Sequence, residues 1–306
     1  MKISIIGAGN VGATTAMRVA QNKLGKVVLF DIVKGLAQGK CFDMDDARAI
    51  LKNDYDLTGT DDIHQLRNSD IVVITAGLAR KPGMTREDLL SKNTQILKSI
   101  CQNLKNLCPD AIIIVVTNPL DLMTYAAIKL TGFKPQRILG MGITLDASRF
   151  ANLISKELGV PVTDIEAVVI GTHGEGMMPL ASLTKVKGKP LTEAVHKDKA
   201  ADLVKRTGLR GAEIVSLLGS GSAYYAPSAA IADLVEVIAS GKTAIRGVSA
   251  YLNGEYGVKD VCIGTLCQIG KNGIEKILEV NLTGEEKAAF LKSANNLKEQ
   301  TKNNPL

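Results

Sequence analysis

Five side chains of the sequence are of types that bind carboxylates or move protons. Arg80 and Arg86 flank a Pro-Gly pair, and a planar guanidinium can hold a carboxylate with two parallel hydrogen bonds. Asp146 and Arg149 are three residues apart in a helical pattern, so they share one face of that helix. His173 stands in a glycine-rich turn, and imidazole is the side chain that titrates near neutral pH. Together these residues predict acid–base chemistry on an anionic substrate.

Each of these features has a plainer interpretation when it is taken alone. A basic loop is usually solvated, an i, i+3 pair is usually a surface ion pair, and a histidine in a turn is often structural. The loop with the two arginines, however, follows a predicted buried strand, and loops at the carboxyl ends of such strands line the ligand crevice of α/β proteins. The choice between the plain and the functional interpretation therefore depends on the strands and helices that carry these residues.

A dinucleotide-binding motif opens the chain. A predicted strand is followed directly by Gly7-Ala8-Gly9-Asn10-Val11-Gly12, a G-x-G-x-x-G pattern at the start of a predicted helix. In this context Gly7 permits the tight turn, Gly9 lets the backbone approach a pyrophosphate, and Gly12 allows the helix to pack on the strand. Asp31 ends the second predicted strand, where a carboxylate would bind the adenine-ribose hydroxyls and repel a 2′-phosphate. The motif predicts NAD as the cofactor rather than NADP.

The first half alternates continuous apolar runs with helical patterns, which is typical of a doubly wound α/β fold with a parallel sheet. The predicted strands are Lys2–Ile6, Val27–Phe30, Ile71–Thr75 and Ala111–Val116, and the predicted helices include Val11–Asn22 and Asp88–Leu107. The first half should therefore be a Rossmann-type domain that binds the cofactor at the carboxyl ends of its strands.

The second half has a mixed α+β pattern. The predicted helices are Leu145–Leu158, Ala201–Leu218, Pro227–Ser240 and Glu285–Lys302, and the predicted strands are Ala167–Gly171, Ala244–Leu252 and Val261–Ile269. The change of pattern near residue 143 predicts an NAD-binding domain over 1–143 and a substrate-binding, catalytic domain over 144–306.

Composition excludes several other classes of protein. The chain has 306 residues, of which 45% are hydrophobic and 22% charged, as in ordinary globular proteins. The net charge of +6 is scattered, and aromatic residues make up only 4%, so we expect no nucleic-acid partner. No apolar run approaches the ~20 residues of a membrane span. Five cysteines without a C-x-x-C pattern predict a reducing, cytoplasmic environment, and the three histidines show no metal-ligand spacing, so no metal site is predicted.

The motifs resemble those of the lactate/malate dehydrogenase family from Lys2 to about Lys276. The resemblance implies hydride transfer between NAD and a 2-hydroxy acid, with His173 as the general acid and base and Asp146 as the residue that orients it. It also implies that Arg149 binds the carboxylate common to these substrates and that Arg86 polarises the substrate carbonyl.

Arg80 matches the family's specificity position, where lactate enzymes have Gln and malate enzymes have Arg. The physical reason agrees, because oxaloacetate brings a second carboxylate that needs a fixed cation. With pyruvate bound, Arg80 would be desolvated and unpaired, which is costly. The resemblance therefore implies malate and oxaloacetate as substrates, with lactate or another 2-hydroxy acid as the alternative.

Further residues match family positions that contact the ligands. Asn118 matches a residue that contacts both substrate and nicotinamide, and Asn93 matches one near the cofactor. Val116 and Thr117 lie in the same segment as Asn118 and are predicted to contact the cofactor. The segment Gly221–Pro227 resembles the far wall of the pocket, so Ser222 and Ala223 are predicted to line it.

Three other functions are weighed against the residues: a non-catalytic NAD sensor, a nucleic-acid-binding scaffold and a short-chain dehydrogenase. A non-catalytic NAD sensor would not need Asp146, Arg149 and His173 together, and a scaffold that binds nucleic acid would need a basic face. Tyr125 and Lys129 spell the Y-x-x-x-K pattern of short-chain dehydrogenases, but the glycine pattern of that family is absent. We therefore expect Tyr125 to pack in a helix and Lys129 to lie at the surface. The family resemblance favours a homotetramer or homodimer.

Overall fold

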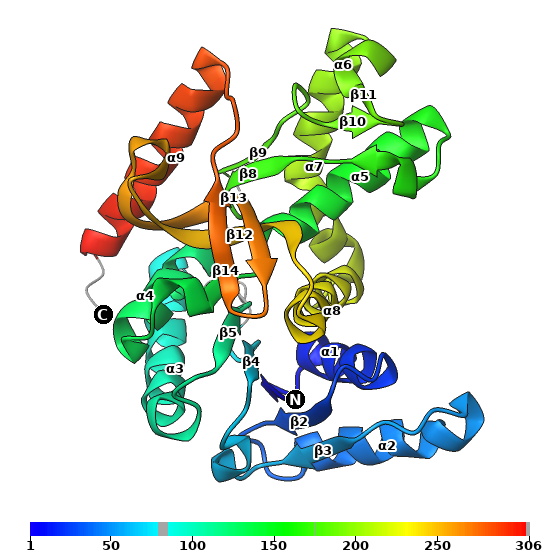
Figure 1. Ribbon diagram of the computed structural model, residues 1–306, viewed down its shortest axis with the longest axis vertical. Helices are drawn as coiled ribbons and strands as arrows, with labels where there is room; N and C mark the ends of the chain where they lie inside the picture. The colour runs from blue at the N-terminus through cyan, green and yellow to red at the C-terminus, as the bar shows by residue number, and fades with distance from the viewer. Residues whose placement is uncertain (79–84, 175, 304–306) are drawn as a thin grey trace.

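The computed structural model describes residues 1–78, 85–174 and 176–303 (Figure 1). Its first half forms a parallel sheet with the strand order β3-β2-β1-β4-β5-β6. The aliphatic strands of this sheet are buried, as strands covered by helices on both faces must be. Their bounds are β1 (Lys2–Ile6), β2 (Lys26–Phe30), β3 (Leu57–Thr60), β4 (Ile71–Ile74), β5 (Ile112–Val115) and β6 (Ile138–Gly140). The predicted doubly wound sheet is confirmed.

Helices cover both faces of the parallel sheet (Figure 1). Two of them, α1 and α2, pack on one face, and α3 and α4 pack on the other. Their bounds are α1 (Asn10–Gln21), α2 (Leu36–Leu51), α3 (Arg86–Leu107) and α4 (Leu120–Thr131). Thr85 and Asp88 form a capping box at the start of α3, with each side chain bonded to the other's backbone N–H, which stabilises the helix end that follows the basic loop.

Three elements of this half had no clear signal in the sequence. β3 reads Leu-Thr-Gly-Thr, with only its first and last residues buried, so it lacks the apolar run of a central strand. β6 is only three residues long. α2 buries only Ala37 and Cys41, so its apolar periodicity is weak. The strands predicted third and fourth are therefore β4 and β5.

The second half continues the same sheet with antiparallel strands. β12 pairs with β6 through Ser249 and Gly140, and β13, β8 and β9 follow, with β14 on the side of β13. The bounds are β8 (Val169–Thr172), β9 (Gly176–Pro179), β12 (Ala244–Asn253), β13 (Lys259–Gly270) and β14 (Gly273–Leu278), with a small separate sheet of β7 (Ile165–Glu166), β10 (Lys185–Val186) and β11 (Lys189–Pro190). The predicted mixed α+β texture is confirmed.

The helices of the second half pack against both halves. Their bounds are α5 (Ile143–Leu158), α6 (Leu191–Ala194), α7 (Lys197–Leu218), α8 (Tyr225–Ser240) and α9 (Gly284–Asn303). In Figure 1, α8 lies beside α1, and Arg18 of α1 donates from Nε to the hydroxyl of Ser228 at 3.0 Å. No helix in the described ranges is long and apolar enough to cross a membrane.

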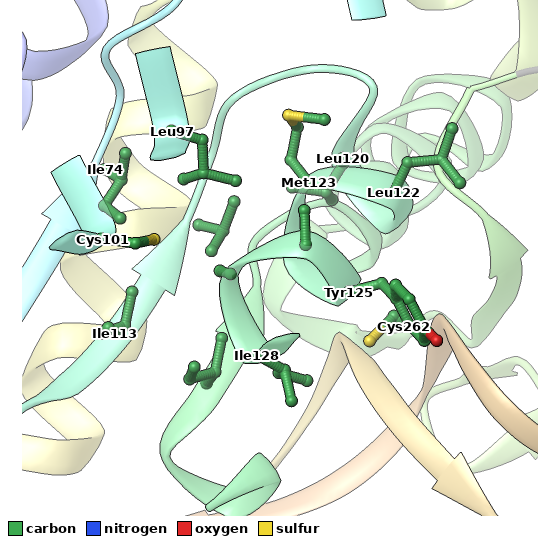
Figure 2. Close-up of a cluster of buried hydrophobic side chains, with 14 of the residues drawn as sticks. Ile74, Leu97, Cys101, Ile113, Leu120, Leu122, Met123, Tyr125, Ile128 and Cys262 are labelled. Atoms are coloured by element: carbon green, nitrogen blue, oxygen red, sulfur yellow. The ribbon is translucent and has the colours of Figure 1, made fainter. Parts of the chain in front are cut away.

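The helix α4 lies at the centre of one hydrophobic core (Figure 2). Met123 and Ala126 have no exposed surface and pack among side chains from β4, β5, α3 and β13. Burying a side chain such as Met123 contributes about 1.5–3 kcal/mol. Because α4 begins directly after Asn118-Pro119, this packing fixes the position of the segment that is predicted to contact both ligands.

Candidate active site

His173 follows the last residue of β8, in a turn between two glycines of positive φ. Gly171 has φ +89° and Gly174 has φ +99°, values that side chains other than glycine rarely adopt. A Cβ atom at Gly142, which caps α5, would lie 2.8 Å from Cγ of His173. The two glycines shape the turn, and Gly142 leaves the space that the imidazole occupies.

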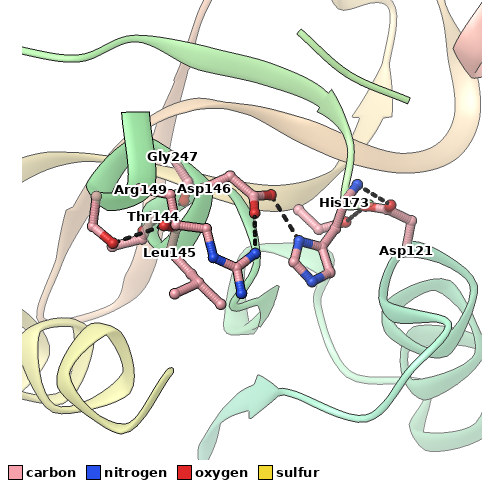
Figure 3. A network of polar contacts seen from close by, with 9 residues as sticks. Asp121, Thr144, Leu145, Asp146, Arg149, His173 and Gly247 are labelled. Carbon is pink, nitrogen blue, oxygen red and sulfur yellow. Dashed lines mark hydrogen bonds and ion pairs between the residues drawn. The ribbon is translucent and has the colours of Figure 1, made fainter. Parts of the chain in front are cut away.

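The ring of His173 meets a buried carboxylate on α5 (Figure 3). Nδ1 of His173 lies 2.7 Å from Oδ2 of Asp146, whose side chain has no exposed surface. The other oxygen of Asp146 accepts a hydrogen bond from Nη1 of Arg149 at 3.1 Å. The resemblance implied separate roles for Asp146 and Arg149, whereas the structure joins the histidine and the arginine through the one carboxylate.

The environment of His173 favours its protonated form. Burial lowers the pKa of His173, but the charge and hydrogen bond of Asp146 and the charge of Asp121 raise it, while Arg149 opposes them. As a result, the pKa of His173 lies above the usual pKa of histidine. An imidazole with Nδ1 held by a carboxylate presents its Nε2 to a substrate, which is the arrangement that general acid–base catalysis needs.

Arg149 carries an unused hydrogen-bond donor in this cluster. Its side chain is only 12% exposed, and its buried Nε has no partner among the described residues. Gly211 of α7 lies against the guanidinium, since a Cβ there would be 3.4 Å from Nη1. A buried donor without a partner is costly. The guanidinium is a fixed cation beside His173, so its charge suits binding of a carboxylate by Arg149.

A second buried carboxylate, which no motif of the sequence marks, lies beneath the histidine turn. Asp121, in the first turn of α4, is 3% exposed. Its Oδ2 accepts the backbone N–H of His173 at 2.9 Å, and its Oδ1 accepts the hydroxyl of Ser249 at 2.6 Å. Burial raises the pKa of Asp121 to about 6, against the opposing effects of these hydrogen bonds and of His173. A carboxylate inside an otherwise apolar helix was the available signal.

The segment of Asn118 is tied to the start of the basic loop by Asn93. Asn93 is fully buried on α3, and its Nδ2 donates to the carbonyl of Asn118 at 2.7 Å. Its Oδ1 accepts the N–H of Leu78 at 2.8 Å. Thr117 is buried and donates to the carbonyl of Ala76. The Asn118-Pro119 peptide is cis. Asn93 therefore holds backbone, and its predicted nearness to the cofactor stays a prediction.

The glycine motif forms a cradle at the start of α1. Gly7 has φ +105°, and a Cβ at Gly12 would lie 1.8 Å from the carbonyl oxygen of Gly7, so neither position admits a side chain without rearrangement. A Cβ at Gly9 would meet no atom of the described residues within 4 Å. Gly9 caps α1 without a side-chain hydrogen bond, so the open helix end offers its N–H groups to an anion.

Two charged residues hold the cradle in place. Oδ2 of Asp31 accepts the N–H of Ala8 at 2.6 Å, and its Oδ1 accepts the N–H of Val33 at 2.9 Å. Nζ of Lys40 donates to the carbonyl of Ala8 at 2.7 Å. Asp31 thus supports the glycine loop and retains lone pairs for ribose hydroxyls. Lys40, one turn inside α2, was not identified from the sequence because its partner is a backbone atom.

For the remaining predicted residues, the structure gives at most the position in the fold and the exposure. Arg80 lies outside the described residues, and Arg86 is the first residue of α3, with its side chain also outside the description. Ser222 is exposed and Ala223 half-buried in the loop between α7 and α8. Val116 is half-buried after β5. The roles predicted for these residues stay predictions.

The Y-x-x-x-K pair forms a structural cluster. Asp260 accepts hydrogen bonds from Tyr125 at 3.1 Å, Lys129 at 3.0 Å and Tyr251 at 3.0 Å. Burial, followed by hydrogen bonding and the charge of Asp260, raises the pKa of Tyr125 above its usual value, although a tyrosine base needs a lowered pKa. Tyr125 packs in α4 and Lys129 lies at the surface, as predicted.

Comparison with known proteins extends over both halves of the chain. Residues 1–140 match the family model of the lactate/malate dehydrogenase NAD binding domain, and residues 143–304 match that of the lactate/malate dehydrogenase alpha/beta C-terminal domain. A malate dehydrogenase of Methanosarcina acetivorans is 48% identical over 297 residues, which are 97% of each chain.

Solved structures of both kinds of enzyme superimpose on this chain. A malate dehydrogenase from Salinibacter ruber is 42% identical with a TM-score of 0.94, over 99% of this chain and 97% of that one. A lactate dehydrogenase from Cryptosporidium parvum, solved with lactic acid and nicotinamide adenine dinucleotide, is 36% identical with a TM-score of 0.95, over 99% and 98% of the two chains. The backbone is therefore common to both activities.

Proposed function

Because the chain belongs to the lactate/malate dehydrogenase family, we infer that it is an NAD-dependent malate dehydrogenase, which interconverts (S)-malate and oxaloacetate. The observation that carries the chemistry is the cluster in which Asp146 bonds both His173 and Arg149. It joins a proton carrier to a carboxylate-binding cation, and a 2-hydroxy acid needs both. The identity to malate dehydrogenases over 97% of the chain supports malate as the substrate.

The cradle at the start of α1 fits the cofactor. Gly9 leaves open space at the uncapped helix end, where a pyrophosphate would approach. We propose that residues 7–12 hold the pyrophosphate and that Asp31 binds the adenine ribose. The segment Val116-Thr117-Asn118 and Asn93 would lie on the nicotinamide side. Bound NAD supplies a hydride acceptor for malate, and NADH supplies the hydride for oxaloacetate.

His173 moves the proton that accompanies the hydride. In malate oxidation the neutral imidazole takes the proton from the C2 hydroxyl, and Asp146 stabilises the imidazolium that forms. In oxaloacetate reduction the imidazolium returns this proton to the C2 oxygen. The raised pKa of His173 keeps the charged form accessible at neutral pH, so both directions can proceed.

The arginines fix the dicarboxylate. We propose that Arg149 binds the carboxylate next to C2, because Asp146 holds its guanidinium beside His173. Arg86 would stabilise the charge that develops on the C2 oxygen, and Arg80 would pair with the second carboxylate. Ser222 and Ala223 would close the far wall. These assignments of Arg80, Arg86, Ser222 and Ala223 rest on the match of the sequence to the family motifs.

Lactate dehydrogenase activity is the second candidate, because a lactate dehydrogenase matches the backbone with a TM-score of 0.95. The two activities differ in whether the substrate has a second carboxylate, which we propose Arg80 binds. The test is to follow loss of NADH absorbance with oxaloacetate and with pyruvate at equal concentrations. We expect a strong preference for oxaloacetate. A preference for pyruvate would overturn the proposed substrate, and no turnover of either would overturn the enzyme.

We propose three further properties. The cofactor half would be residues 1–143 and the catalytic half residues 144–306. The exposed apolar residues Phe42 and Ile50 on α2 and Leu217 on α7 support a homodimer or homotetramer, since such side chains are usually covered. Light scattering would give the assembly. Five buried free thiols support a cytoplasmic location.

A further inference from the structure

A buried carboxylate that no substrate or cofactor role requires lies behind the proposed proton carrier. Asp121 is 3% exposed, and its two oxygens are bonded to the N–H of His173 and the hydroxyl of Ser249. It comes from α4, whereas Asp146 comes from α5, so the two carboxylates approach His173 from different elements (Figure 3).

Neutral groups would serve as well if Asp121 only held the turn. An asparagine oxygen accepts a backbone N–H without the free-energy cost of burying a charge. No cation is bonded to Asp121 among the described residues, although Lys or Arg usually accompanies a buried carboxylate. Among the residues that the structure describes, the charged groups that face His173 are Asp146 and Arg149 on α5 and Asp121 on α4, and Ser249 on β12 completes the cluster.

Resting on the proposed function, we propose that Asp121 is a positioning residue for proton transfer, which fixes the backbone of His173 and stabilises its imidazolium from the side opposite Asp146. Within the described part of the site, the imidazolium then forms beside two carboxylates and one guanidinium. Asp146 sets the ring orientation, and Asp121 supplies a second negative charge and anchors the turn that carries the ring.

The titration of the two groups agrees with this arrangement. Burial lowers the pKa of His173, whereas the charges of Asp146 and Asp121 raise it. Burial raises the pKa of Asp121 to about 6, against the effects of Ser249 and His173. Asp121 is therefore mostly ionised at neutral pH, where its charge can act on the imidazole. Below pH 6 it takes up a proton and this effect is lost.

The substitution Asp121→Asn separates the charge from the hydrogen bonds, because the amide oxygen can still accept the N–H of His173 and the amide NH₂ can donate to Ser249. We would titrate the imidazole proton resonances by NMR in the full chain. The exposed His64 and His196 are internal references. Asp260→Asn is the matched control, since Asp260 also ties α4 to its neighbours but does not face His173.

We expect Asp121→Asn to move the titration of His173 to lower pH, and the pH profile of malate oxidation to move with it. His64, His196 and the Asp260→Asn variant should titrate as in the wild type. A His173 titration and a rate profile that both stay in place would overturn the proposal and leave Asp121 as a cap of the turn.

A second variant covers the case in which Asp121→Asn does not fold. Ser249→Ala removes the hydrogen bond that favours ionised Asp121, so it should move the His173 titration in the same direction by a smaller amount. An unchanged titration there would count against the proposal. The NMR titration does not require the protein to be an active enzyme. If the titration of His173 shifts as expected but the protein does not turn over oxaloacetate, the proposed function is overturned and the role of Asp121 is not.

Discussion

The imidazole Nδ1 of His173 and the carboxylate of Asp146 lie 2.7 Å apart although the two residues are 27 positions apart in the chain. The histidine directly follows the end of β8, and the first turn of α5 carries the aspartate. A carboxylate without exposed surface on one ring nitrogen fixes the tautomer and leaves the other nitrogen for the substrate.

Replacing His173 by Asn should remove the proton carrier. We expect kcat for oxaloacetate reduction to fall by about 10²–10⁴, with NADH binding retained because the glycine cradle is untouched. Steady-state rates and NADH fluorescence titration would measure the two effects. Turnover at the wild-type rate would show that His173 is not the acid and base.

The two reaction directions should depend on pH in opposite ways. Malate oxidation needs neutral His173, so its rate should rise as pH passes the raised pKa of the imidazole. Oxaloacetate reduction needs the imidazolium and should fall over the same range. Asp146→Asn removes the largest effect that raises the pKa, so both limbs should move to lower pH. Profiles that keep their positions in this variant would contradict the pairing.

Arg80→Gln should change which substrate is preferred. Without the guanidinium the second carboxylate of oxaloacetate has no cation, and pyruvate no longer leaves a buried charge unpaired. We expect kcat/KM to fall far more for oxaloacetate than for pyruvate. Arg206→Gln, an exposed arginine on α7, is the control. Equal losses for both substrates would mean that Arg80 does not select between them.

Asp31→Asn should weaken the choice between NADH and NADPH. The variant loses the negative charge that repels a 2′-phosphate, and the amide oxygen can still accept one of the two backbone N–H groups that Asp31 now holds. We expect KM for NADH to rise and the ratio of activities with NADH and NADPH to fall. Asp62→Asn, a carboxylate that caps a neighbouring turn, should leave the ratio unchanged.

Asp121→Asn should stabilise the fold more at high pH than at low pH. The pKa of Asp121 is about 6 in the folded protein and about 3.9 when unfolded. The folded state therefore binds this proton more tightly, and stability falls as pH rises from about 4 to about 6, by up to about 3 kcal/mol. The variant lacks this loss. Urea unfolding of the wild type and of the variant at low and at high pH would measure this difference in the free energy of unfolding. An equal difference at both pH values would refute the prediction.

The architecture follows from local pattern to a large extent. Apolar runs such as Ile112–Val115 and the glycines before α1 are contiguous in the chain, so their meaning can be judged within a few residues. β3 was missed because Leu-Thr-Gly-Thr takes its structure from the neighbouring β2, with which it pairs over its whole length.

The candidate site depends on contacts between distant segments, and there the sequence is less informative. The joining of His173 and Arg149 through Asp146 could be expected in part, since motifs mark all three. Asp121 meets His173 across 52 residues, and Lys40 meets a backbone carbonyl across 32. Contacts of this kind arise from the way whole helices pack against other elements. The spacing of residues within one segment therefore does not predict them.

The pairing of β12 with β6 and the contact of α8 with α1 make the chain a poor source of exchangeable modules. A fragment that ended at residue 143 would leave the hydrogen-bonding edge of β6 open, and it would uncover the apolar side of α1 where Ile231 and Val235 of α8 now share its core. Such edges invite aggregation. A chimaera that keeps a native interior must therefore transfer β12 and α8 along with the cofactor half, although they lie far beyond it in the sequence.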